Sequence, residues 1–105
     1  MFKFLAACTA ALMLSGPASA ASPLSLANDL GSILASETVC GLTYDQAAIT
    51  AWIEKEVPAD AMDFPGRLQT MTRGYSRQLA NMGASEKTAH CSAVKRIASN
   101  FGFTS

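Results

Sequence analysis

Residues 64–82 read FPGRLQTMTRGYSRQLANM and carry the clearest helical pattern in the chain. Apolar side chains recur there at steps of three and four residues, at Phe64, Leu68, Met71, Tyr75, Leu79 and Met82. This spacing predicts an amphipathic helix that buries one face. Gly74 lies inside the segment and lowers helix stability by about 1 kcal/mol relative to alanine, so we interpret it as the point of a close helix crossing.

Two further helices are expected before this segment. The first spans Pro23–Cys40, with Ser22 as its N-cap. The second begins with a capping box in which the side chains of Thr43 and Gln46 satisfy each other's backbone amides, and it ends before Pro58. Their expected buried stripes are Leu26, Leu30, Ile33, Leu34 and Cys40 in the first helix and Ala48, Ile49, Trp52, Ile53 and Val57 in the second.

A fourth helix is expected after residue 83. Gly83 ends the preceding helix, Ser85 caps the next one, and Glu86 in its first turn suits the helix dipole. Its expected apolar face consists of Cys91, Val94, Ile97, Ala98 and Phe101, and Gly102 ends it. No convincing alternation of apolar and polar residues predicts a strand. The fold class predicted is therefore an all-α, four-helix bundle.

The N-terminal segment Met1–Ala20 has the pattern of a secretory signal peptide. Lys3 supplies the positive start, Phe4–Leu14 the apolar run, and Ala18–Ala20 a small-residue cleavage site. The apolar run covers about 11 residues and is shorter than the roughly 20 needed to cross a bilayer. We therefore expect a mature single domain, residues 21–105, in the periplasm or outside the cell.

The three cysteines predict one disulfide bond. Cys8 is lost with the signal peptide, which leaves Cys40 and Cys91 as an even pair in an oxidising compartment. Their bond closes a loop of 51 residues, which is worth about 4 kcal/mol in a chain-entropy model. We expect this bond to join the first helix to the last around the third.

The residues that usually carry catalysis or bind metals are sparse. His90 is the only histidine, and its neighbour Cys91 points about 100° away from it on a helix. No Gly-x-Ser-x-Gly motif of a serine hydrolase is present. Once Cys8 is lost with the signal peptide, one histidine and two cysteines remain, too few for a usual four-ligand zinc site of cysteine and histidine. The acidic residues between Glu54 and Asp63 lack EF-hand spacing. We expect no catalytic residue, metal or cofactor.

Charge is segregated along the chain. Residues 21–63 hold seven acids and one base, a net charge of −6, whereas residues 64–105 hold six bases and one acid, a net charge of +5. The whole chain is neutral, which disfavours nucleic acid as a partner. The halves either neutralise each other inside the bundle, or the third and fourth helices present a basic face to an acidic envelope protein or surface. The candidate residues of that face are Arg67, Arg73, Arg77, Lys95 and Arg96.

Residues 40–103 resemble a family of short exported proteins of Gram-negative bacteria whose function is not established. The shared elements are Val39-Cys40-Gly41-Leu42, Tyr44-Asp45-Gln46-Ala47, Lys87-Thr88-Ala89-His90-Cys91, Arg96-Ile97-Ala98 and the terminal Phe101-Gly102-Phe103. Some members carry the label signal recognition particle, which does not suit a chain with an export signal and no GTPase phosphate loop. The resemblance implies an all-helical periplasmic protein and transfers no catalytic residue.

These observations lead to one main functional prediction and two alternatives. The main prediction is a non-enzymatic, exported helical module that binds another molecule. The first alternative is a periplasmic holdase chaperone activated by acid, because the chain is similar to such chaperones in size and cysteine separation. Protonation of the seven acids in residues 21–63 would also leave the chain strongly positive and expanded. The second alternative is an inhibitor or immunity-type protein of the cell envelope.

Overall fold

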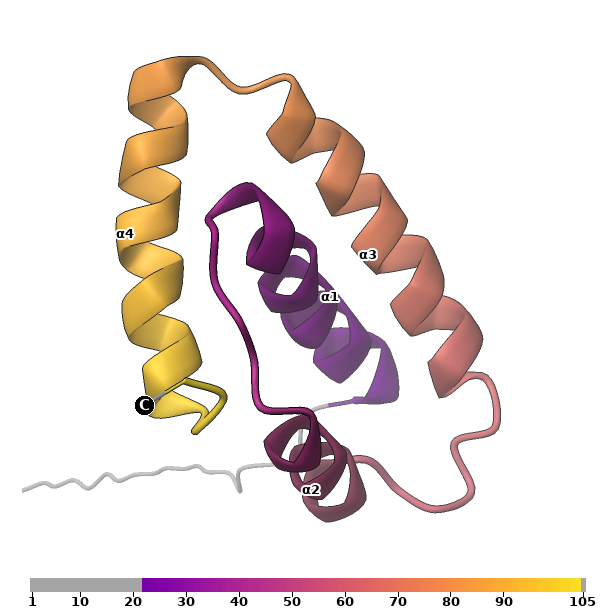
Figure 1. Ribbon diagram of the computed structural model, residues 1–105. Coiled ribbons are helices and arrows are strands. Elements are labelled where there is room, and N and C mark those ends of the chain that lie inside the picture. The colour runs from indigo at the N-terminus through magenta and orange to yellow at the C-terminus, as the bar shows by residue number, and fades with distance from the viewer. Residues whose placement is uncertain (1–21, 105) are drawn as a thin grey trace, which may run out of the picture.

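The computed structural model describes residues 22–104, and over this range it consists of four α-helices and no strand. They are α1 (Pro23–Val39), α2 (Gln46–Glu56), α3 (Phe64–Ala80) and α4 (Ala84–Asn100). The prediction of a small all-α bundle is therefore confirmed (Figure 1). The expected signal peptide, Met1–Ala20, lies outside the described residues.

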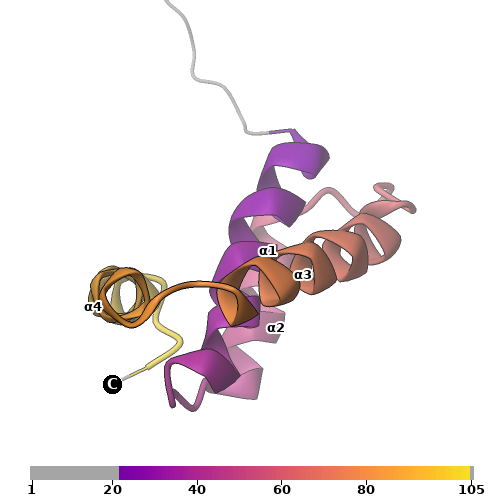
Figure 2. The ribbon, with the colours of Figure 1, turned by 90° about the horizontal axis from the view of Figure 1, so that it is seen from above.

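Helix α1 is the central element and lies between α3 and α4 (Figures 1 and 2). Its buried residues are of mixed size, namely Leu26, Ala27, Leu30, Gly31, Ile33, Ala35 and Ser36. In α3 only Phe64 and Leu79 are buried. We expected the disulfide to join the first and last helices around the third, and the last part of this expectation is wrong, because α1 and not α3 lies in the middle. Periodicity locates an apolar face, but the small residues of α1 allow neighbouring helices to approach it from more than one side.

The closest helix crossing occurs at Gly31 of α1. A Cβ atom placed there would lie 2.8 Å from the Cβ of Met71 and 3.2 Å from the backbone nitrogen of Thr72, both in α3. At Gly74 a Cβ atom would meet nothing within 4 Å. The interpretation of Gly74 as the crossing point is therefore wrong, and the missing side chain that brings α1 and α3 together belongs to α1.

Two expected helix caps differ from the observed ones. The N-cap of α2 is Asp45. Its Oδ1 accepts from the backbone N–H groups of Ala47 and Ala48, in the first turn of the helix, at 3.0 and 3.4 Å. The expected capping box of Thr43 and Gln46 is not formed, because the helix begins later. Similarly, the N-cap of α4 is Gly83 and not the expected Ser85, which lies inside the helix. The backbone N–H of Gly83 donates to the Glu86 carboxylate at 3.3 Å.

The C-terminal segment after α4 folds back onto the core. Phe103 is fully buried, with its ring centroid 5.8 Å from that of Tyr44, and its carbonyl accepts from the backbone N–H of Asp45 at 2.8 Å. The Phe101 ring stacks on Trp52 of α2 with the centroids 5.7 Å apart. These contacts attach the end of α4 to α2 and to the loop that precedes it.

Candidate functional site

The disulfide joins the end of α1 to α4. Cys40 is the C-cap residue of α1, Cys91 lies in the second turn of α4, and their Cα atoms are 5.3 Å apart. The predicted pairing is confirmed. Disulfides are typical of compartments outside the reducing cytosol. Both cysteines are partly exposed, so the bond lies at the surface between the two helices.

A serine–histidine pair lies one turn away from the disulfide. The hydroxyl of Ser36, which is fully buried, donates to the carbonyl of Ser32 at 2.8 Å and lies 2.8 Å from Nε2 of His90. A hydroxyl has only one hydrogen, so when Ser36 donates to Ser32 its bond to His90 is donated by the tautomer of His90 that carries a hydrogen on Nε2. A catalytic base would need to accept the serine proton, and substrate cannot reach a fully buried Oγ. The pair therefore has the geometry of a structural contact between α1 and α4.

The structure finds His90 half-buried. Sequence reasoning did not identify Ser36 as its partner. The signal was present: Ser36 precedes Cys40 by one helical turn, and His90 is adjacent to Cys91. A disulfide between the two cysteines brings these neighbours together.

Two adjacent hollows run along α4. The first, of about 540 Å³, is lined by Val39, Cys40, Leu42, Ala84, Lys87, Thr88, Cys91, Ser92 and Lys95. The second, of about 430 Å³, is lined by Leu42, Ser92, Lys95, Arg96, Ser99 and Thr104. They share Leu42, Ser92 and Lys95, and we call the two together the α4 groove. Its apolar side comes from the end of α1 and the loop that follows, and its cations and most of its hydroxyls come from α4.

Buried Tyr44 fixes the loop that carries Leu42 into this groove. Its phenol donates to the carbonyl of Ile33 at 2.8 Å, and its backbone N–H donates to the Glu37 carboxylate at 2.8 Å. Burial, reinforced by the nearby charge of Glu37, raises the pKa of the Tyr44 phenol to about 12. The phenol therefore stays protonated, and keeps its hydrogen bond, at neutral pH.

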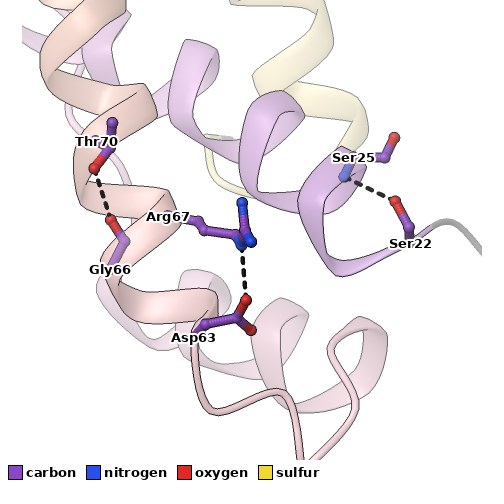
Figure 3. A network of polar contacts seen from close by, with 6 residues as sticks. All are labelled: Ser22, Ser25, Asp63, Gly66, Arg67 and Thr70. Carbon is purple, nitrogen blue, oxygen red and sulfur yellow. Dashed lines mark hydrogen bonds and ion pairs between the residues drawn. The ribbon is translucent and has the colours of Figure 1, made fainter.

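In the part of the chain that the structure describes, the acidic and basic halves are joined by a single ion pair, at the boundary between them. The one pair found there links Arg67 to Asp63 at 2.7 Å, within a single turn of chain (Figure 3). The hydrogen bond from Arg67 lowers the pKa of the Asp63 carboxyl. Both side chains are well exposed, and such pairs contribute little to stability. Within residues 22–104, the opposite charges of the two halves are therefore largely not neutralised by direct ion pairs.

The five candidate residues of the basic face lie on two separated helices. Arg67, Arg73 and Arg77 are exposed on α3, whereas Lys95 and Arg96 are exposed on α4. The two helices lie on opposite sides of α1 (Figures 1 and 2). The structure thus brings Lys95 and Arg96 together in the α4 groove and leaves the α3 arginines elsewhere.

Lys87 is the groove residue that sequence reasoning missed. It precedes Cys91 by four residues, and Lys95 follows Cys91 by four. Residues four apart in a helix share a face, so both lysines flank the disulfide along α4. The regular spacing Lys-x-x-x-Cys-x-x-x-Lys could have indicated that both lysines lie beside the disulfide. It indicates a surface groove only once Cys91 is known to be partly exposed.

Comparisons with protein-family models, with curated proteins and with solved structures found no match. The resemblance to a family of exported proteins therefore stays a prediction. Among residues 22–104, no group of three or more histidine, cysteine or acidic side chains is placed to hold a metal ion. No helix in that range is both long and apolar enough to cross a membrane.

Proposed function

We propose that this chain is a non-enzymatic helical binding module of the periplasm or the exterior, and that it docks an extended acidic segment of a partner protein in the α4 groove. The observation that carries the proposal is the groove itself. Lys87 and Lys95 flank an apolar wall formed by Val39 and Leu42, and neither lysine has an acidic partner within the described residues. Opposite charge in a partner would complement this surface.

The spacing of the lysines specifies the partner segment further. Eight residues of helix separate Lys87 from Lys95, which is an axial distance of about 12 Å. An extended peptide rises about 3.3 Å per residue, so acidic residues four positions apart would match the two lysines. The residue midway between them lies on the same side of an extended chain and would meet the apolar wall. The proposed segment therefore has the pattern acid-x-aliphatic-x-acid.

The test is a titration with a synthetic peptide of that pattern, measured by calorimetry at low salt. A control peptide carries glutamines in place of the acids. The charge-reversal variant Lys87→Glu with Lys95→Glu should weaken binding by about tenfold, since each exposed charge pair contributes up to about 1 kcal/mol.

The matched control reverses two cations on the other helix, Arg73→Glu with Arg77→Glu. This variant changes the net charge by the same amount, and we expect it to bind the peptide like the original chain. Equal weakening by both variants would mean that net charge alone governs binding, and weakening by the α3 variant alone would move the site to α3. Either result contradicts the proposal, as does equal binding of the glutamine peptide.

One observation favours the acid-activated holdase as a second candidate function. Carboxylates hold the connection between α1 and α2, because Glu37 accepts from the Tyr44 backbone N–H and Asp45 caps α2. None of the residues of α2 is fully buried, although Trp52 and its neighbours pack on the core. Protonation of both acids would weaken the attachment of α2 and expose this apolar stripe.

The holdase is tested by light scattering of an aggregating client protein at low pH, with and without this chain. Suppression of scattering at low pH but not at neutral pH supports it, together with a change in Trp52 fluorescence over the same range. Unchanged scattering at low pH contradicts the holdase and leaves the binding module as the proposed function.

A further inference from the structure

The disulfide forms part of the floor of the α4 groove. Cys40 and Cys91 both line the larger hollow, and both residues are partly exposed. Lys87 and Lys95 line the same hollow, one helical turn on either side of Cys91. A cationic, accessible surface of this kind favours thiolate chemistry, because the attacking and the leaving groups are both anions.

We propose that the Cys40–Cys91 bond is an exchangeable disulfide. Its reductant is an anionic thiol, that is, a molecule with one or two thiols and with carboxylates near the sulfur. The lysines attract the carboxylates and the thiolate to the groove and stabilise the thiolate that leaves. This exchange goes beyond the proposed function, since it rests on the position of the disulfide and its test uses no acidic peptide.

The exchange has two steps. The thiolate of the reductant attacks Sγ of one cysteine, the Cys40–Cys91 bond breaks, and its electron pair leaves on the sulfur of the other cysteine as a thiolate. A second thiol of the reductant then attacks the mixed disulfide and releases the first cysteine. The protein gains two electrons and two protons, and the reductant is oxidised to a disulfide.

Release of this bond would loosen a junction that has few other contacts. Within the described residues, the hydrogen bond between Ser36 and His90 links α1 to α4 near the disulfide. The far end of α4 is anchored separately, through Phe103 in the C-terminal segment. The two walls of the α4 groove come from the segments that the disulfide joins. Reduction therefore acts on the shape of the groove while Phe103 keeps α4 attached.

The experiment measures the rate constant for reduction of the oxidised chain by mercaptopropionate, which carries a carboxylate, and by mercaptoethanol, which is neutral. The measured quantity is the ratio of the two rate constants, each corrected for the fraction of thiolate. In the variant Lys87→Gln with Lys95→Gln this ratio should fall by about fivefold at low salt, and the difference should shrink at high salt. The variant Arg73→Gln with Arg77→Gln should keep the original ratio.

Two outcomes would overturn the proposal. The first is an unchanged ratio in the lysine variant, which would mean that the groove does not guide the thiol. The second is a reduction rate that rises steeply with low concentrations of urea, because the sulfurs would then be reached only after unfolding. Circular dichroism of both variants checks that each keeps its helices, and a rate independent of low urea supports reaction at the native surface.

Discussion

Substitution of Gly31 by alanine tests the packing of α1 on α3 directly. The new Cβ atom would lie 2.8 Å from the Cβ of Met71 and 3.2 Å from the backbone nitrogen of Thr72. Rotation of a side chain cannot move either of these atoms, because one belongs to the backbone and the other is bonded to it. The two helices must therefore separate, and overpacking of this kind typically costs about 1–3 kcal/mol.

An opposite effect has to be subtracted. Alanine favours a helix over glycine by about 1 kcal/mol, so Gly31→Ala alone combines a gain and a loss. The matched variant Gly74→Ala has the same gain and no clash, since nothing lies within 4 Å of its new Cβ. The difference between the two variants isolates the clash, and we expect Gly31→Ala to be less stable than Gly74→Ala by about 1–3 kcal/mol.

The assay is urea unfolding of the oxidised protein, followed by circular dichroism, with the free energy of unfolding taken from a common slope. In thermal unfolding, each 1 kcal/mol corresponds to about 4–8 °C for a domain of this size. Equal stability of the two variants would refute the reasoning, since it would show that the two helices are not held in contact at Gly31.

Three further predictions concern other parts of the fold. Asp45→Ala should lower the free energy of unfolding by about 1 kcal/mol through loss of the α2 cap, whereas Thr43→Ala should change it by less than about 0.5 kcal/mol in the same urea assay. The Tyr44 phenol should titrate near pH 12 by ultraviolet absorbance. Its contribution to stability is complete below pH 10.0 and is lost as the pH rises toward 12, and Tyr44→Phe should abolish that loss. Replacement of Cys40 and Cys91 by alanine should cost about 4 kcal/mol, and a cost below about 1 kcal/mol would contradict a stabilising role for the 51-residue loop.

The sequence was sufficient to predict the four helices, because the signals that start and end them are local. Pro23 and Gly41 bracket α1, and Pro58 lies just beyond the end of α2. Each of these residues acts through its own backbone conformation, independently of the rest of the chain. The disulfide was predictable for a different reason, since only two cysteines were expected in the exported domain.

The errors arose where distant residues decide a local structure. The backbone N–H of Asp45 donates to the carbonyl of Phe103. This contact holds the chain outside the helix up to Asp45, so the Asp45 side chain becomes the cap and the expected box at Thr43 is not formed. Similarly, whether Gly31 or Gly74 lies at a crossing depends on which faces of α1 and α3 meet. Helical periodicity within one segment does not contain that information.

Part of the candidate site was likewise predictable from local sequence, and part depended on how the helices are arranged. Lys95 and Arg96 were predictable as a basic pair because they are adjacent on one helix, and they lie together in the α4 groove. Their expected association with Arg73 and Arg77 required α3 and α4 to be neighbours. Helix α1 lies between the two instead, since its small buried residues make it the element on which both helices pack.

The fold does not depend on the charges that the proposed function uses. Its hydrophobic core consists of apolar side chains along α1 with Tyr44, Phe64, Ala98 and Phe103 around them. Exposed ion pairs contribute about 0–1 kcal/mol, and neither Lys87 nor Lys95 forms one within residues 22–104. Reversal of these two lysines should therefore change the free energy of unfolding by no more than about 0.5 kcal/mol each. A loss of peptide binding in that variant, accompanied by unchanged stability, would then report on recognition alone.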